Sequence, residues 1–434
     1  MKTFARYLSL LALAVLVFTA CNAVVVLVPR ELLVRRVLAG YEEGALGTED
    51  YPGRRVWIGI DQFSDCVMLQ TMIDRQPAWL ATAISARYLR FDPGGPGTCL
   101  RLRDEVAGQG APVEHVHYHR YWFGNRTVTA LLVATLGVGG GRIALTIAGY
   151  ASVLLLLAVA FRRSRRLGLW TLPIALFALV FGGLPHLGPL YSHAPQWIVC
   201  WLAAALLLVV KDMDPHRLRL RAALLGAVFA YFDVLLSTPL CPLLVTAVVY
   251  LRCFDASGDA RASAKTAGAA LVGAGAGIVA TVLLKPLLSG AYFGFGGVLG
   301  DFFSQLFVRV GASERRWFFA PIAAVWRTLD YATFADGAFK WPIVGFGLAG
   351  YGIAIVLWWR RRTQGHALLL GLACTVLLAA WYLGMANHTE NHPDLMSRHV
   401  FLPLALGWTA VLVQVAAMHR KPLRARADGP AAPF

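Results

Sequence analysis

Long runs of apolar residues, separated by short charged clusters, dominate the pattern of this chain. A helix of about 20 apolar residues crosses roughly 30 Å of hydrocarbon, with allowance for tilt. By this measure the sequence predicts ten crossings, near 6–29, 142–161, 168–184, 195–210, 220–236, 239–252, 266–288, 341–359, 366–386 and 399–418. The segment 239–252 is short enough to be re-entrant, but without it the later basic loops would fall on the wrong side. We therefore expect an all-α integral membrane protein with about ten transmembrane helices.

The basic residues between these runs indicate a topology. Clusters at 162–166, 211–221, 252–265 and 360–362, and the tail 419–434, alternate onto one face if both termini are cytoplasmic. The chain then divides into a first transmembrane helix at 1–29, an extracytoplasmic loop at 30–141, a helix bundle at 142–418 with a second extracytoplasmic loop at 289–340, and a basic cytoplasmic tail at 419–434. A short histidine-rich turn at 387–398 also faces the extracytoplasmic side.

Periodicity inside the first long loop predicts helices that lie on the membrane surface. Asp65 to Ile73 resembles the start of an amphipathic helix, and 92–97 is a turn-rich break. Helical periodicity resumes at 118–136 and ends at the glycine-rich stretch 137–141. Aromatic and basic residues flank this second segment, which is typical of a helix lying flat at the interface.

Composition supports the membrane assignment and excludes other classes. Of 434 residues, 58% are apolar and 15% are charged, which is more apolar surface than one soluble core could bury. The formal charge of +16 would suit nucleic acid, but the basic residues mark the ends of spans. We expect the lipid bilayer as a partner and no nucleic acid. The Arg- and Ala-rich composition indicates a bacterial genome, hence the bacterial cytoplasmic (inner) membrane.

The seven cysteines include no CxxC pair, which argues against a structural zinc site. Cys66 and Cys99 share the first long loop, where oxidation is permitted, so a disulfide between them and two free thiols remain alternatives. The sequence also shows no internal repeat, which weakens the case for a transporter built from inverted halves.

Two carboxylates in the first loop are candidates for a general base. Asp61 and Asp65 stand four residues apart, which places both on one face of a helix. A carboxylate within hydrogen-bond reach of an acceptor hydroxyl can take its proton. Asp61 is equally well interpreted as a helix N-cap, so Asp65 is the stronger candidate.

The segment 114–126 is rich in histidine, arginine and aromatic residues. One interpretation is an interfacial aromatic belt with snorkelling arginines. The other is a binding surface for a phosphate and a sugar ring, because Arg donates bidentate hydrogen bonds and aromatic rings stack on sugars. Its candidate residues are His117, Tyr118, His119, Arg120, Trp122 and Arg126. Alternating histidines could also bind a divalent metal, which the sequence leaves open.

Other polar residues lie in or beside the apolar spans. Asp233 stands in a stretch broken by two prolines, where it either forms a structural hydrogen bond or lines the site. Lys285 could pair with Asp233 or meet a lipid phosphate. The second long loop carries further charges, among them Asp301 and Arg309.

The turn at 387–398 adds a last group of candidates. Reversing the chain between two spans does not require several polar side chains, so the turn is a site candidate. Its candidate residues are Asn387, His388, His392 and Arg398.

Together these features resemble the GT-C glycosyltransferases, which are integral membrane enzymes. The resemblance implies a sugar donor linked to polyprenyl phosphate, an external-loop carboxylate as base and, in some members, a divalent metal. By position, Asp61 and Asp65 correspond to that base, but no adjacent acidic pair follows the first span as it does in the family. Three local patterns, at 118–122, 232–239 and 387–398, also resemble a group of uncharacterised bacterial multi-span membrane proteins.

The leading hypothesis is therefore an inverting transfer of a sugar from polyprenyl phosphate to an extracytoplasmic glycan, lipid or protein. Asp65 or Asp61 would supply the base. The phosphate would meet Arg120, Arg126, Lys285 and Arg398, and the sugar would meet Tyr118, Trp122 and Phe123. A transporter or flippase for an anionic or lipid-linked solute, and a structural subunit of an envelope complex, are the alternatives.

Overall fold

The computed structural model describes residues 2–51, 61–89, 95–109, 114–182, 184, 188–233, 237–311, 322–323, 325–326, 340–361, 365–392 and 396–419. Most of the predicted basic tail, and residues 92–94 of the predicted turn, lie outside these residues. The described chain is almost entirely helical, which confirms the predicted class.

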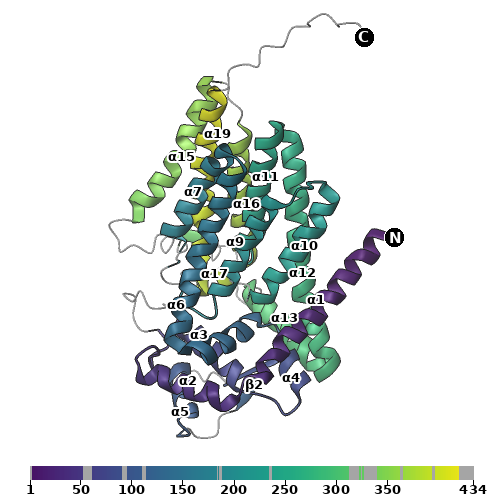
Figure 1. The fold of residues 1–434 in the computed structure, drawn as a ribbon, viewed down its shortest axis with the longest axis vertical. Coiled ribbons are helices and arrows are strands. Elements are labelled where there is room, and N and C mark those ends of the chain that lie inside the picture. The colour runs from purple at the N-terminus through teal and green to yellow at the C-terminus, as the bar shows by residue number, and fades with distance from the viewer. Residues whose placement is uncertain are drawn as a thin grey trace, which may run out of the picture.

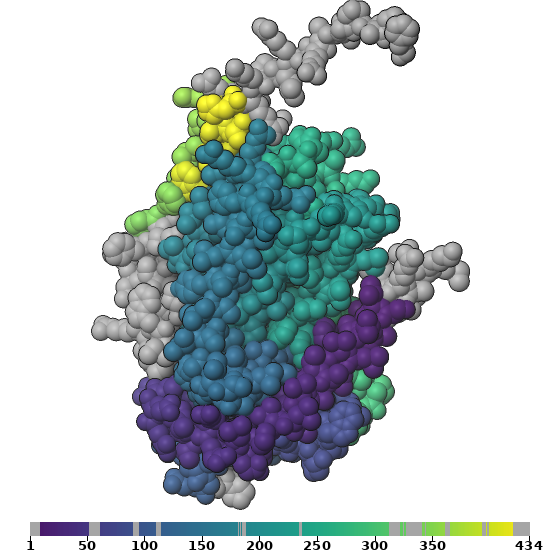
Figure 2. All heavy atoms as spheres, viewed as in Figure 1, coloured from purple at the N-terminus to yellow at the C-terminus, as the bar shows by residue number. Residues whose placement is uncertain are grey.

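Most helices run along the long axis as a bundle, and a smaller cap closes one end (Figure 1). The bundle helices are α6 (Gly124–Arg163), α7 (Arg165–Phe181), α9 (Ala194–Val209), α10 (Pro215–Phe232), α11 (Leu240–Ser257), α12 (Ala260–Phe293), α15 (Lys340–Arg361), α16 (His366–Gly384) and α19 (Phe401–Met418). The C-terminal end of α19 lies at the end opposite the cap. The first helix, α1 (Lys2–Leu27), crosses one face into the cap, as the purple segment of Figure 2 shows.

Among the described residues, six helices are long and apolar enough to cross a membrane, and two shorter apolar helices accompany them. The six are α1, α6, α11, α12, α16 and α19, and the shorter two cover Ala194–Val209 and Val344–Arg360. A helix lies in each of the ten predicted regions, but the count of ten crossings is not confirmed. The protein is therefore a multi-span helical membrane protein.

The cap is built from short elements that follow α1. They are α2 (Arg30–Glu42), α3 (Gln62–Ile73), α4 (Trp79–Ile84), β1 (Ala86–Leu89), α5 (Thr98–Val106) and β2 (His115–Tyr118). The strands pair antiparallel, with Ala86 opposite Tyr118 and Leu89 opposite His115. This small sheet was not predicted.

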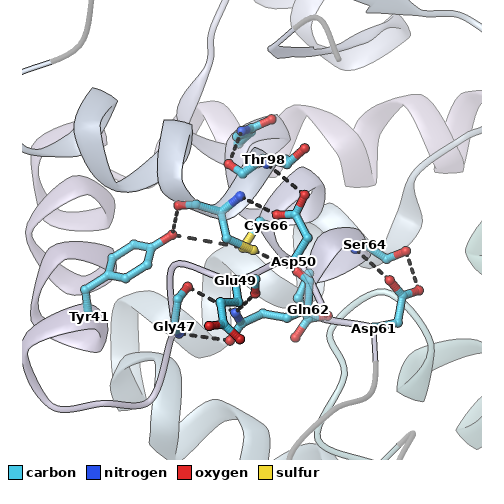
Figure 3. Close-up of a disulfide and its surroundings, with 12 residues drawn as sticks. Tyr41, Gly47, Glu49, Asp50, Asp61, Gln62, Ser64, Cys66 and Thr98 are labelled. Atoms are coloured by element: carbon cyan, nitrogen blue, oxygen red, sulfur yellow. Dashed lines mark hydrogen bonds between the residues drawn. A yellow bond between two sulfur atoms is a disulfide. The ribbon is translucent and has the colours of Figure 1, made fainter. Parts of the chain in front are cut away.

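A disulfide joins α3 to α5 through Cys66 and Cys99, which confirms the oxidised alternative. The Asp50 carboxylate accepts hydrogen bonds from the backbone N–H groups of Thr98 and Cys99, at 2.9 and 2.8 Å. It thereby satisfies two of the free donors at the start of α5. Figure 3 shows Asp50, the disulfide and Tyr41, whose hydroxyl donates to the Cys99 carbonyl at 2.7 Å.

Helix α6 differs from the sequence prediction of a separate surface helix at 118–136. The chain leaves β2 at Tyr118, starts α6 only at Gly124 and continues through a kink at Gly137 into the predicted span. Gly137 has φ 71°, a conformation that glycine adopts without steric cost. The glycine-rich stretch thus bends one long element where a break between two helices was expected.

Helices α10 and α12 approach each other closely through small residues. A Cβ atom added at Gly277 would lie 1.9 Å from the Ala223 carbonyl oxygen, and one at Gly273 would lie 2.3 Å from that of Arg219. Small residues spaced four apart allow helix backbones to pack closely in a membrane. This contact holds α12 in place along the bundle.

Gly277→Ala should therefore destabilise the protein by about 1–3 kcal/mol, because the added methyl group forces the helices apart. Gly275→Ala is the matched control, since a Cβ at Gly275 meets nothing within 4 Å. The control should be neutral or slightly stabilising, because alanine favours helix. Thermal unfolding of both variants in detergent tests this difference, and equal melting temperatures would contradict it.

Candidate functional site

A cavity of about 250 Å³ lies among α12, α16, the segment after β2 and α13 (Phe295–Arg309). Its lining residues are Arg120, Tyr121, Thr238, Ile278, Val279, Val282, Leu283, Phe302, Gln305, Leu306, Arg309, Trp381 and Met385. Val279, Leu283 and Leu306 are 56%, 48% and 36% exposed, so apolar side chains border the cavity on the molecular surface. The cavity is therefore apolar, and Arg120 and Arg309 are the charged residues among those that line it.

Each of the two arginines lies over an aromatic ring and has one further polar partner. The Arg120 guanidinium lies 4.4 Å from the centre of the Tyr118 ring, and its Nε lies 3.6 Å from an Asp301 carboxylate oxygen. The Arg309 guanidinium lies 5.6 Å from the centre of the Tyr121 ring and donates to His388 Nδ1 at 3.3 Å. Cation–π contacts of this kind hold a guanidinium in place while leaving its N–H donors available.

A strained residue shapes the segment that carries Arg120 and Tyr121. Phe123 has φ 56°, and it is the one non-glycine residue with positive φ in the described part of the chain. Such a conformation costs on the order of 1–3 kcal/mol and persists where the surroundings enforce it. The buried Phe123 ring packs against Tyr118 and Tyr121, with centroids 4.9 and 6.1 Å away. This packing fixes the turn between Arg120 and the start of α6.

Asp233 is buried next to the cavity and holds Thr238, one of the residues that line it. It ends α10, and its carboxylate accepts from the backbone N–H of Ser237 at 3.0 Å and from the Thr238 hydroxyl at 2.5 Å. Thr238 lines the cavity, whereas Asp233 is 4% exposed. Of the two interpretations of Asp233, these contacts favour the structural hydrogen bond.

The polar turn after α16 reaches the same region. It contains α17 (Ala386–Asn391), where Asn387 donates to the Val308 carbonyl at 2.6 Å and His388 contacts Arg309. The His388 and His392 rings lie 4.9 Å apart. The side chain of Arg398 lies outside the described residues, although its backbone belongs to the short helix η1 (Ser397–Val400).

Three predicted phosphate or sugar ligands lie in a different place. Lys285 and Arg126, each 1% exposed, donate to the carbonyls of Ile84 and Thr82 at the end of α4. Trp122 is 2% exposed and donates to the Thr281 carbonyl at 2.9 Å. Basic side chains at a helix C-terminus are favourable because the last carbonyls carry partial negative charge. These three residues thus tether the cap to the bundle, and Lys285 does not pair with Asp233.

His117 and His119 form a third group. Their rings lie 5.1 Å apart, each lies 4.9 Å from the Phe293 ring, and His119 Nδ1 lies 3.0 Å from the Ser85 hydroxyl. Burial, with smaller contributions from His117 and Lys285, lowers the pKa of His119 to about 4. His119 is therefore neutral at pH 7. In the described part of the chain no three His, Cys, Asp or Glu side chains are grouped to hold a metal ion, so the divalent-metal hypothesis gains no support there.

Asp61 caps α3 and joins it to the bundle. Its carboxylate accepts from the Ser64 N–H at 3.0 Å, as Figure 3 shows, and lies 3.0 Å from His193 Nε2. Burial acts to raise the pKa of Asp61, but the hydrogen bonds and charge of His193 and the Ser64 hydrogen bonds outweigh it and lower the pKa. The N-cap interpretation of Asp61 is confirmed.

Asp65 is fully buried and bonded on both oxygens. One oxygen lies 3.0 Å from Arg142 Nη2, and the other accepts from the N–H and hydroxyl of Ser192 at 3.2 and 3.1 Å. Burial raises the pKa of Asp65, which suits a base, but its side chain is 0% exposed. An acceptor hydroxyl would have to replace one of these partners to reach it.

The predicted site residues thus fall into separate groups. The cavity region brings together Arg120, Asp233, Asn387, His388 and His392, and Tyr118 stacks on Arg120. It does not include Asp61, Asp65, His117, His119, Trp122, Arg126 or Lys285. Sequence reasoning did not assign a role to Arg309 or Asp301. An amphipathic helix ending in arginine at 295–309 was the signal that could have found them.

No protein-family model, no curated protein and no solved structure matches this chain. The geometry of the cavity and the chemistry of its residues therefore carry the functional argument.

Asp65→Ala should destabilise the protein by about 3–5 kcal/mol, because it leaves Arg142 buried without its charge partner. Asp212→Ala is the matched control: Asp212 also pairs with an arginine, at 2.7 Å, but at an exposed position where solvent screens the pair, so its removal should change stability far less. Denaturant unfolding in detergent measures both. Unchanged stability for Asp65→Ala would contradict the interpretation that buried Arg142 depends on Asp65 as its charge partner.

The lowered pKa of His119 predicts a pH dependence of stability. The neutral imidazole is favoured in the folded state, so its contribution is complete above the ordinary value of 6.5 and is lost as the pH falls toward 4. His119→Gln should make the melting temperature less sensitive to pH between 6.5 and 4, whereas a variant at the exposed His216 should not. Parallel curves for wild type and His119→Gln would show that His119 titrates normally.

Proposed function

We propose that this protein is a membrane glycosyltransferase that moves a sugar from a polyprenyl-phosphate donor to an extracytoplasmic acceptor, whether glycan, lipid or protein. The proposal depends on one observation, which is that the apolar cavity carries Arg120 and Arg309 on its lining. A polyprenyl phosphate has matching chemistry, since it joins a long hydrocarbon chain to an anionic group.

The walls suit the chain of such a donor. Ile278, Val282 and Phe302 line the cavity, and the exposed Val279 and Leu283 continue this surface along α12. Lipid tails and such a surface are about equally apolar, so a polyprenyl chain can exchange between them at little cost. A lipid-linked donor could therefore reach the cavity from the bilayer without crossing water.

The arginines suit the phosphate, both as ligand and as leaving group. Guanidinium groups bind phosphate through paired, charge-assisted hydrogen bonds. When the acceptor oxygen attacks the anomeric carbon, the bond from that carbon to the phosphate oxygen breaks and negative charge builds on the phosphate. Fixed cations at that point stabilise the transition state.

We propose that the site faces the extracytoplasmic side of a bacterial inner membrane, and the cap and the basic residues are in keeping with that side. The Cys66–Cys99 disulfide belongs to the cap, and disulfides persist in oxidising compartments. At the opposite end of the bundle, Arg163 and Arg252 donate to the Leu208 and Leu207 carbonyls of α9. Arginine at that end follows the positive-inside rule.

Arg120→Ala and Arg309→Ala should each weaken binding of a polyprenyl phosphate by about 10- to 150-fold, the equivalent of a lost charged hydrogen bond of about 1.5–3 kcal/mol. Transfer of labelled sugar from polyprenyl-phosphate donors to a membrane extract should fall as well. Arg36→Ala, at an exposed position on α2, is the matched control and should match wild type.

Three results would contradict the proposal. Absence of polyprenyl-phosphate binding by the wild type would remove its basis. Movement of the donor across vesicles without any sugar transfer would favour a transporter, and equal loss in the Arg36 control would show that the effect is general surface charge.

A further inference from the structure

The cavity also has a carboxylate beside it that differs from the other acidic groups near the site. Asp301 lies on α13, where Asp301, Gln305 and Arg309 recur every four residues along one face. Gln305 and Arg309 line the cavity, and the Asp301 carboxylate lies 3.6 Å from Arg120 Nε. Asp301 therefore stands next to the cation that we assign to the donor phosphate.

The Asp301 carboxylate is more exposed and less tightly bonded than the other carboxylates considered for the site. Asp61, Asp65 and Asp233 are each at most 4% exposed, and both carboxylate oxygens of each have hydrogen-bond partners at 2.5–3.1 Å. By contrast, 41% of the Asp301 side chain is exposed, and its distance from Arg120 is longer than a hydrogen bond. Among the residues that the structure describes, Arg120 Nε has no hydrogen-bond partner, so this ion pair is a loose one.

We propose that Asp301 is the general base of the transfer, and that the donor phosphate displaces it from Arg120. This inference rests on the proposed function, since it names the base for the same site. Arg120 has one face in contact with Tyr118, and its donors can serve the Asp301 carboxylate or a phosphate. Donor binding would thus free the carboxylate at the moment when it is needed.

The acceptor O–H gives its proton to an Asp301 carboxylate oxygen while the acceptor oxygen forms a bond to the anomeric carbon. The bond between that carbon and the phosphate oxygen breaks, and its electron pair leaves with the polyprenyl phosphate, held by Arg120 and Arg309.

The test is Asp301→Asn in the full-length protein, with binding and turnover measured separately. Polyprenyl-phosphate binding should be equal to wild type or tighter, because the competing carboxylate charge is gone. The turnover number for transfer from labelled polyprenyl-phosphate sugar to a membrane extract should fall by about 10²–10⁴-fold. Asp301→Glu should recover part of the turnover, and the acidic limb of the wild-type pH profile should vanish in Asp301→Asn.

Asp104→Asn is the matched control, because Asp104 also forms an arginine pair, with Arg103 at 2.7 Å, but on α5 of the cap. It should leave binding and turnover unchanged. Wild-type turnover in Asp301→Asn, with loss in His392→Gln, would overturn the inference and place the base on the α17 side. A parallel loss of binding and turnover would make Asp301 a positioning residue. A wild type that does not bind polyprenyl phosphate would refute the proposed function itself.

Discussion

Hydrocarbon offers no water to a polar group, so each charge or free carbonyl near the bilayer must find a partner in the protein. This requirement explains most of the ionisable residues that stand out in the sequence. Arg142 and Asp65 satisfy each other between the bundle and the cap, 3.0 Å apart. Lys285 and Arg126 donate to the last carbonyls of α4. The cap is consequently fixed to the bundle by ionic and carbonyl contacts at several points.

The same requirement separates structural charges from those with capacity to bind a ligand. A carboxylate with partners on both oxygens, such as Asp65, gains little from a further partner and loses stability when one is removed. Arg120 and Arg309 lie beside an apolar cavity, each over an aromatic ring, with one further partner each, Asp301 at 3.6 Å and His388 at 3.3 Å. A charged residue is therefore a candidate for the site when it lies beside the cavity and its hydrogen-bonding groups are not all taken up by the protein.

The sequence predicted the helices well because apolar length is a local property. The region 399–418 became α19 (Phe401–Met418), and Asp61 became the N-cap that one interpretation gave it. The partners of buried charges could not be predicted in this way. The carbonyl that Lys285 meets belongs to Ile84, 201 residues earlier in the chain. Such a pairing depends on the packing of the cap against α12, which no local pattern encodes.

Helix α13 shows how a site can form from a segment that was expected to be a loop. Phe303 and Phe307 are 48% and 58% exposed, whereas Phe302 and Leu306 line the cavity from the same helix. An amphipathic helix at the membrane surface buries its apolar side among lipid chains. In α13 this apolar surface continues into the cavity wall, and the helix ends with Arg309 beside the cavity. One short helix thereby brings a lipid-facing surface and the Arg309 side chain within a few turns of each other.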